Sequence, residues 1–296
     1  MRFFKITMSR VNKNQNLRMD WKGRHIDFSL KTFIMGILNV TPDSFSDGGK
    51  FYDTGRAVEQ VLLMQEDGAD IIDIGGESSR PGAKPVPFDV ELSRVIPVLK
   101  AIIRKIKVIV SIDTIKASVA EAALSEGAEM VNDVSALRGD PKMAPLLAKQ
   151  EVPVVLMHMR GTTPQNMQAD TQYHNLISEI IEFLQERISF AQMSGIGHSR
   201  IIIDPGIGFG KSIEKDNFTI LKHLGKFKSL GKPILVGPSR KAFLGHLLDL
   251  PVNDREEATA AAVAVSVVNG ANIVRVHDIK KIKRVVQIAD AIKAAE

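Results

Sequence analysis

The chain has 296 residues, of which 44% are hydrophobic and 25% charged, with a formal net charge of +5 and no cysteine. This composition predicts one large α/β domain or two ordinary ones, and the missing cysteines exclude disulfides, thiolate nucleophiles and cysteine zinc sites. No run of about 18 apolar residues is present, so the sequence predicts no membrane span.

Residues 1–19 form a basic leader with five basic and no acidic residues, which leaves 34 residues of each sign in the rest of the chain. The pI near 9.3 therefore does not indicate a basic binding face, and with only 5% aromatic residues we expect no nucleic-acid partner. We expect a disordered leader, the alternative being the remnant of a targeting segment. No signal peptide is visible, and we expect a cytoplasmic protein.

A small hairpin is predicted for residues 18–32, where a Lys-Gly turn separates short apolar segments. Eight short apolar runs follow along the chain. They cover residues 33–40, 70–76, 107–113, 129–134, 152–158, 200–206, 233–237 and 272–277. Because these runs are nearly continuous and do not alternate, they indicate parallel strands that are covered on both faces.

Segments with helical periodicity fill the intervals between the predicted strands. They cover residues 57–66, 92–103, 115–126, 141–149, 177–188, 216–224, 255–270 and 279–293. Eight strands alternating with eight helices over about 260 residues predict an α/β fold, a (β/α)8 TIM barrel whose N-terminal end is closed by the hairpin. A doubly wound sheet is the alternative. No linker divides residues 20–296, so we expect one domain, with a kink at Pro97.

Functional residues of such a barrel lie at the C-terminal ends of the strands. Here every strand ends in polar or charged residues, and the second ends in the sequence GGESSRPGA at residues 75–83. A connecting turn alone would not need hydroxyl groups and an arginine in that place. The alternative is a solvated turn with a surface arginine, but eight such ends on one rim predict a binding site.

Two kinds of ligand group are visible on this rim. Asp113, Asn132 and Asp204 could accept hydrogen bonds from the N–C(NH2)–N edge of a flat heterocycle, or could instead cap the helices that follow them. The second group is cationic and suits phosphate, with Asn39 as an oxygen ligand for Mg2+. Its members are Arg80, Lys241, Arg275 and His277. Glu77, Asp133 or Asp278 could instead neutralise some of these cations.

The glycine-rich segment 206–212 ends in Gly-Lys-Ser and so has a superficial similarity to a phosphate-binding P-loop. Pro205 occupies the place of the first P-loop glycine, and the segment follows the sixth strand. We therefore interpret it as a flexible loop that lets Phe209 pack on the ligand.

Several signatures of the chain together resemble the dihydropteroate synthase family. They lie at residues 35–49, 73–83, 157–164, 204–211, 237–241 and 275–278, in order, and the resemblance covers about residues 20–295. Residues 160–165 depart from the family pattern by an extra threonine or a shifted proline. The resemblance implies a transferase that condenses 6-hydroxymethyl-7,8-dihydropterin diphosphate with p-aminobenzoate to give 7,8-dihydropteroate and pyrophosphate.

The resemblance also implies roles for individual residues. Pterin binding is implied for Asp113, Asn132, Met157, Asp204, Phe209 and Lys241. Diphosphate binding is implied for Asn39, Arg80, Arg275 and His277, with Asn39 near Mg2+. Binding of p-aminobenzoate is implied for Phe45, Ser79, Arg80, Pro81, Ser239 and Lys241. The catalytic set would be Arg80, Asp113, Lys241, Arg275 and His277.

Two alternatives to this function remain open at the level of sequence. A pterin-dependent methyltransferase has a similar barrel but handles no diphosphate, so the cationic group would have no role. A non-catalytic pterin-binding paralogue would retain the residues without turnover. In either case residues 258–268 are apolar almost all round, which predicts a second buried face and, as in the family, a homodimer.

Overall fold

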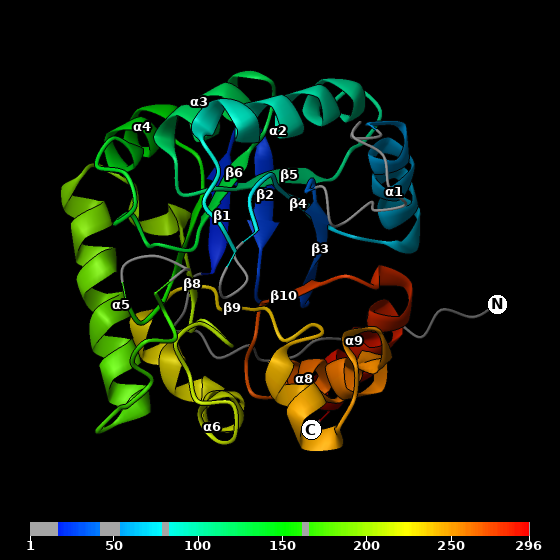
Figure 1. The fold of residues 1–296 in the computed structure, drawn as a ribbon, viewed down its shortest axis with the longest axis vertical. Coiled ribbons are helices and arrows are strands. Elements are labelled where there is room, and N and C mark those ends of the chain that lie inside the picture. The colour runs from blue at the N-terminus through cyan, green and yellow to red at the C-terminus, as the bar shows by residue number, and fades with distance from the viewer. Residues whose placement is uncertain (1–16, 42–53, 79–82, 162–165, 296) are drawn as a thin grey trace.

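The computed structural model describes residues 17–41, 54–78, 83–161 and 166–295. In these ranges a sheet of eight parallel strands lies at the centre of a ring of helices (Figure 1). The strands are β3 (Phe33–Asn39), β4 (Ile71–Gly75), β5 (Ile109–Asp113), β6 (Met130–Asp133), β7 (Val154–Met157), β8 (Ile201–Asp204), β9 (Leu235–Val236) and β10 (Ile273–Val276). Each lies within an apolar run of the sequence.

The sheet closes into a barrel. Its hydrogen-bonded order is β8-β7-β6-β5-β4-β3-β10-β9, and the two end strands meet through a parallel bridge between Ile203 and Ile234. The amide of Ile203 also donates to the carbonyl of Pro233 at 3.0 Å. The (β/α)8 barrel predicted from the sequence is therefore confirmed, and the doubly wound alternative is wrong.

Nine α-helices occur in the described part of the chain. They are α1 (Thr54–Asp67), α2 (Phe88–Ile102), α3 (Ala117–Ser125), α4 (Met143–Gln150), α5 (Leu176–Met193), α6 (Asp216–Lys222), α7 (Ala242–Leu248), α8 (Glu256–Val268) and α9 (Ile279–Ala294). Asn175 and Asp278 cap α5 and α9 by accepting from the amides of Ser178 and Lys281. Helix α2 continues through Pro97 as α-helix. Sequence analysis missed α7, whose seven residues are too few for a periodic pattern.

The hairpin consists of β1 (Arg18–Trp21) and β2 (Arg24–Asp27), paired antiparallel. Lys22 and Gly23 between them both have positive φ, which is typical of a two-residue hairpin turn. Met19 and Trp21 are buried and share a cluster with the N-terminal layer of inward-facing strand residues, so the hairpin closes that end of the barrel as predicted. Residues 18 and 19, placed in the leader by sequence analysis, belong to β1; residues 1–16 lie outside the described residues.

Alternating strand residues pack on two different sides of the barrel wall. Ile72 and Ile74 of β4 belong to the large outer core between strands and helices, whereas Ile71 belongs to the inner cluster with the hairpin. Because side chains alternate along a strand, Asp73 and Gly75 face the interior above Ile71. Polar residues of the other strands reach the same upper interior, which forms the site. Within the described residues, none of the helices has the length and apolarity needed to cross a membrane.

Candidate functional site

The centre of the rim is a network of four polar side chains. Arg275 of β10 donates from Nε to Oδ2 of Asp73 at 2.7 Å and from Nη2 to Oδ2 of Asp113 at 2.8 Å. Asn132 of β6 donates from Nδ2 to the same oxygen of Asp73 at 2.9 Å. The structure therefore brings together Asp113, Asn132 and Arg275, which sequence analysis had assigned to two different ligand groups.

Strand register explains why these residues meet. Asp73 of β4 is the partner of Ser111 in β5, and Asp113 is the partner of Asn132 in β6. Residues two apart on one strand face the same side, so these side chains all enter the upper interior. Asp113 does not cap α3, because the capping position is Lys116 and no side-chain cap is formed there. The capping alternative for Asp113 is therefore wrong.

Burial sets the charge state of the two carboxylic acids at the strand ends. It raises the pKa of Asp113 to about 7, although the adjacent Arg275 guanidinium acts in the opposite direction. It raises the pKa of Asp204 to about 6, although the amide of Gly206 donates to Oδ1 of Asp204 at 2.7 Å and favours the anion. Both groups thus change charge near neutral pH, where they can exchange hydrogen bonds with a ligand.

The loop after β8 depends on glycine and on one buried lysine. Gly206 has φ +74, and a Cβ there would lie 1.8 Å from the carbonyl oxygen of His158. Nζ of Lys211 donates to Nδ1 of His158 at 2.8 Å and to the carbonyls of Gly206 at 3.0 Å and Phe209 at 2.8 Å. Lys211 therefore fixes the loop, which sequence analysis had interpreted as flexible. Burial lowers the pKa of Lys211 to about 7.

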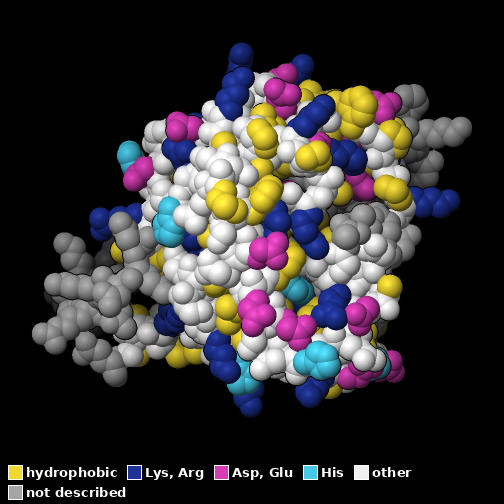
Figure 2. All heavy atoms as spheres, turned by 90° about the vertical axis from the view of Figure 1, so that its left-hand side faces the viewer, with side chains coloured by type: hydrophobic (Ala, Val, Ile, Leu, Met, Phe, Trp, Pro, Cys, Tyr) yellow, Lys and Arg dark blue, Asp and Glu magenta, His cyan; other side chains and the backbone are white. Residues whose placement is uncertain are grey.

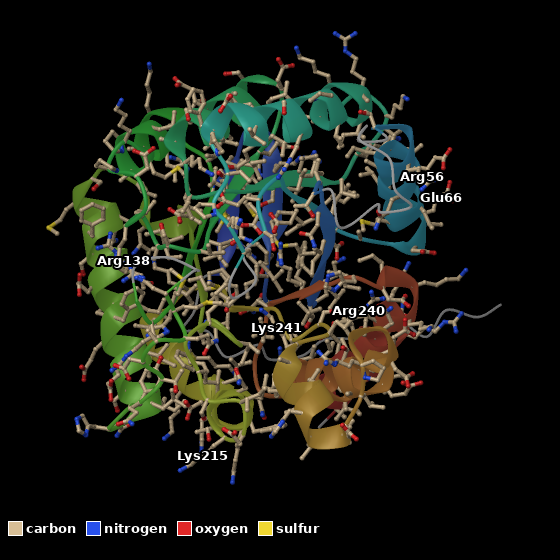
Figure 3. All side chains as sticks on the ribbon, viewed as in Figure 1. Arg56, Glu66, Arg138, Lys215, Arg240 and Lys241 are labelled. Carbon is tan, nitrogen blue, oxygen red and sulfur yellow. The ribbon has the colours of Figure 1, made fainter. Side chains whose placement is uncertain are left out.

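An apolar wall borders this polar centre. Met157 and Phe209 belong to one buried cluster with Val134, Met159 and Met167, and Ile115 packs against it. Nζ of Lys241 lies over the Phe209 ring, 4.2 Å from its centroid, and burial lowers the pKa of Lys241 to about 8. Figure 3 shows Lys241 inside the ring of helices, while Lys215 lies at its outer edge. Apolar surface thus lies beside buried acids and a cation, and this combination suits a flat ring system with polar edges.

The ends of β3, β9 and β10 contribute Asn39, Ser239 and His277. Asn39 is the register partner of Gly75, and Ser239 Oγ lies 2.9 Å from Nδ1 of His277. The amide of His277 also donates to Ser239 Oγ at 3.3 Å. Phe45, Ser79, Arg80 and Pro81 lie outside the described residues, as does most of the segment 160–165 that departs from the family pattern.

The charge-neutralising partners of the site differ from those considered from the sequence. Arg275 pairs with Asp73 and Asp113, whereas Glu77 pairs with Lys116. The second candidate acid, Asp133, accepts from the amides of Ser135 and Leu137. Asp278 caps α9 and lies 3.7 Å from Lys281 Nζ. These three acids therefore stabilise loops and helices next to the site.

Asp73 and Lys211 were missed as site residues. Asp73 could have been noticed as a lone acid within the apolar run IIDIG, where a buried charge requires a partner. Lys211 was set aside with the rejected P-loop interpretation.

The comparisons with known proteins agree with this geometry. The model of the family described as pterin binding enzyme matches residues 35–277. Dihydropteroate synthase from Bacillus subtilis (strain 168) is 46% identical over 266 residues, which cover 90% of each chain. The solved structure of Xanthomonas albilineans dihydropteroate synthase with 4-aminobenzoic acid is 42% identical with a TM-score of 0.87 and covers 95% of this chain and 100% of that one. A structure of that enzyme with 7,8-dihydropteroate has a TM-score of 0.84 at 40% identity, covering 94% and 100%.

Proposed function

We propose the following reaction from the premise that the chain belongs to the dihydropteroate synthases of the pterin-binding enzyme family. The chain condenses 6-hydroxymethyl-7,8-dihydropterin diphosphate with p-aminobenzoate. The products are 7,8-dihydropteroate and pyrophosphate. One network of hydrogen bonds carries this proposal. Arg275 contacts both Asp113 and Asp73, and Asp73 in turn contacts Asn132, whose amide is expected to face the pterin. A pterin-dependent methyltransferase handles no diphosphate, so the cationic group of the rim would have no anionic ligand there.

The pterin ring is bound by the acceptors of the upper interior. Asp204 and Asp113 accept N–H bonds from the ring edges, and Asn132 contributes its amide between them. Phe209 and Met157 provide apolar surface for the ring. Lys241, held over Phe209, supplies the donor that the carboxylates cannot.

The diphosphate is bound on the β10 side of the rim. Arg275 and His277 face the departing negative charge, together with Arg80 from outside the described residues. Breaking the bond between the pterin methylene and the diphosphate oxygen leaves positive charge on the methylene, which the ring shares. The cationic side chains stabilise the diphosphate as it departs, and Asp113 stabilises the positive ring.

We propose that Mg2+ reaches this site as an ion carried by the substrate. Among the described residues no group of three or more His, Asp or Glu side chains could hold a metal ion by themselves. Asn39 offers one amide oxygen at the end of β3, and Mg2+ accepts such a ligand when phosphate oxygens and water complete its shell. When bound, the ion would neutralise part of the diphosphate charge.

The arylamine needs no nucleophilic side chain. Its nitrogen attacks the methylene after diphosphate has left and then loses one proton to the departing diphosphate or to solvent, so the chain's task is to orient it. We place Ser239 and Lys241 beside it, with Phe45, Ser79, Arg80 and Pro81 from outside the described residues completing its site.

A homodimer accounts for the surface of α7 and α8. Leu247 and Leu248 at the end of α7 are 65% and 51% exposed, and Val265 and Val268 of α8 are 46% and 45% exposed. Exposed aliphatic residues on consecutive helices are typical of an interface. The face in Figure 2 shows hydrophobic side chains together with interspersed acidic and basic ones, and such a face does not suit a nucleic-acid partner. We place the dimer in the cytoplasm, in keeping with a chain that has no cysteine.

The proposal is tested with Asp204→Asn, which removes one charged acceptor and keeps the shape. We expect pterin affinity to fall by about 2–4 kcal/mol, as for a broken buried charge-assisted pair. Calorimetric titration with 6-hydroxymethylpterin measures this loss. Parental affinity in the variant would contradict the pterin site.

A further inference from the structure

Asp73 of β4 contacts polar side chains from two other strands, β6 and β10. Its side chain is fully buried, and its Oδ2 accepts from both Arg275 Nε and Asn132 Nδ2. Arg275 faces the diphosphate and Asn132 faces the pterin in the proposed function. One carboxylate oxygen therefore connects the two halves of the site.

The contact with Asp73 determines how the Asn132 amide is oriented. A carboxylate bonded to a guanidinium accepts hydrogen bonds and has no proton to donate, so only the NH2 end of an amide can face it. The amide oxygen of Asn132 is then directed away from Asp73. Among the described residues no donor to that oxygen is found, which leaves it for an N–H group of a ligand.

The second oxygen of Asp73 argues against a purely structural role. Oδ1 is buried and has no hydrogen-bond partner among the described residues. An unsatisfied buried carboxylate oxygen destabilises the fold, and apolar residues usually replace a buried ion pair at little loss of stability. Asp73 is therefore better explained by what it does to Asn132 and Arg275 than by its effect on folding.

We propose that Asp73 is a positioning residue that determines specificity, because it fixes which end of the Asn132 amide meets the pterin and holds Arg275 in the same contact. This inference rests on the proposed function, since it takes the pterin as the ligand. The inference predicts that pterin binding depends on whether the group at position 73 accepts or donates a hydrogen bond. A group at position 73 that can either donate or accept would let the amide turn over and present a donor where the ligand also has one.

The test compares Asp73→Asn with Asp133→Asn, using 6-hydroxymethylpterin as the probe. Both aspartates are fully buried, Asp73 on β4 and Asp133 on β6, but Asp133 accepts from Ser135 and Leu137 outside the site. We expect Asp73→Asn to weaken pterin binding by about tenfold or more, as for a lost hydrogen bond to a charged group. Asp133→Asn should lower Tm and leave pterin affinity unchanged.

A polarity swap separates the proposed role from a merely structural one. In the double variant Asp73→Asn with Asn132→Asp, the amide at position 73 can accept from Arg275 and donate to the carboxylate at position 132. The oxygen at position 132 still faces the ligand, and the net charge is unchanged. We expect this pair to bind the pterin within about threefold of the parent, whereas each single variant does not, because contacting residues are energetically coupled.

Three results would overturn the inference. The first is parental pterin affinity in Asp73→Asn, and the second is a folded double variant that binds no better than the single ones. If Asp73→Asn shows no cooperative thermal transition, Asp73→Ser is measured in its place. The third result is parental pterin affinity in Asp73→Ser. If the parent does not bind the pterin, the proposed function and this inference are both wrong. If the parent binds it, the variants alone decide the inference.

Discussion

Arg275 Nη2 lies 2.8 Å from Oδ2 of Asp113, and this contact joins β10 to β5, two strands that β3 and β4 separate in the barrel. Nε of the same guanidinium donates to Asp73 of β4 at 2.7 Å. A guanidinium reaches the two carboxylates from two different nitrogens that are held in one rigid plane. The arginine thus organises both the acceptor side and the cationic side of the site.

Arg275→Lys should therefore disable the enzyme although it preserves the charge. A lysine lacks the planar fork and cannot reproduce the separate contacts of Nε with Asp73 and of Nη2 with Asp113, so we expect kcat/KM to fall by about 10²-fold or more. Steady-state kinetics measure this. Arg200→Lys is the control, because Arg200 lies before β8 at the opposite end of the barrel, where it pairs with Glu151. Equal kinetics of the two variants would contradict the role of Arg275.

Pterin binding should weaken as the pH falls. Asp113 and Asp204 have pKa values of about 7 and about 6, raised by burial, so each loses its charge as the pH falls through its pKa. A protonated carboxyl accepts hydrogen bonds less well than a carboxylate, so affinity should decrease below about pH 7 and again below about pH 6. Titrations with 6-hydroxymethylpterin across this range measure the effect. Asp204→Asn should remove the lower step, and an affinity independent of pH would contradict the assignment of both acids.

Lys211→Met should destabilise the loop after β8. The variant removes one buried ammonium from Nδ1 of His158 and from the carbonyls of Gly206 and Phe209. We expect the free energy of unfolding to fall by about 1–3 kcal/mol and pterin affinity to fall with it, because this loop contains Phe209 and follows directly after Asp204. Thermal denaturation and titration test both effects. Lys215→Met is the control, since Lys215 is exposed at the outer edge of the molecule (Figure 3).

Particular residues show what could be predicted from the sequence. The apolar runs located all eight strands, because parallel strands covered on both faces cannot contain many polar residues. Asn132 and Asp204 were predicted as site residues because they are polar residues at the ends of apolar strands. Their hydrogen-bond partners depend on strand register and on closure of the barrel. A local sequence pattern predicts neither of these.

Asp73 illustrates the limit of local patterns. It lies inside β4 and not at its end, so a search of strand ends passes over it. Its importance follows from contacts with β6 and β10, which are 59 and 202 residues away along the chain. Lys211 was overlooked for the related reason that its partners, apart from the loop itself, come from β7 through His158.

The proposed dimer predicts a specific surface effect. Val265→Asp places a charge on the exposed side of α8, where burial against a second subunit would be costly. We expect the parent to sediment as a dimer at micromolar concentration and this variant as a monomer. Leu63→Asp on α1 is the control, because Leu63 is 55% exposed on a different part of the ring and should leave the dimer intact. A monomeric parent would contradict the proposal.

Product stoichiometry tests the central claim most directly. Purified chain is supplied with 6-hydroxymethyl-7,8-dihydropterin diphosphate, Mg2+ and p-aminobenzoate, and 7,8-dihydropteroate and pyrophosphate are both measured over time. We expect the two products in equal amounts, and no dihydropteroate when p-aminobenzoate is left out. A chain that binds the pterin but forms no dihydropteroate would be a non-catalytic pterin-binding protein, and that result would contradict the account.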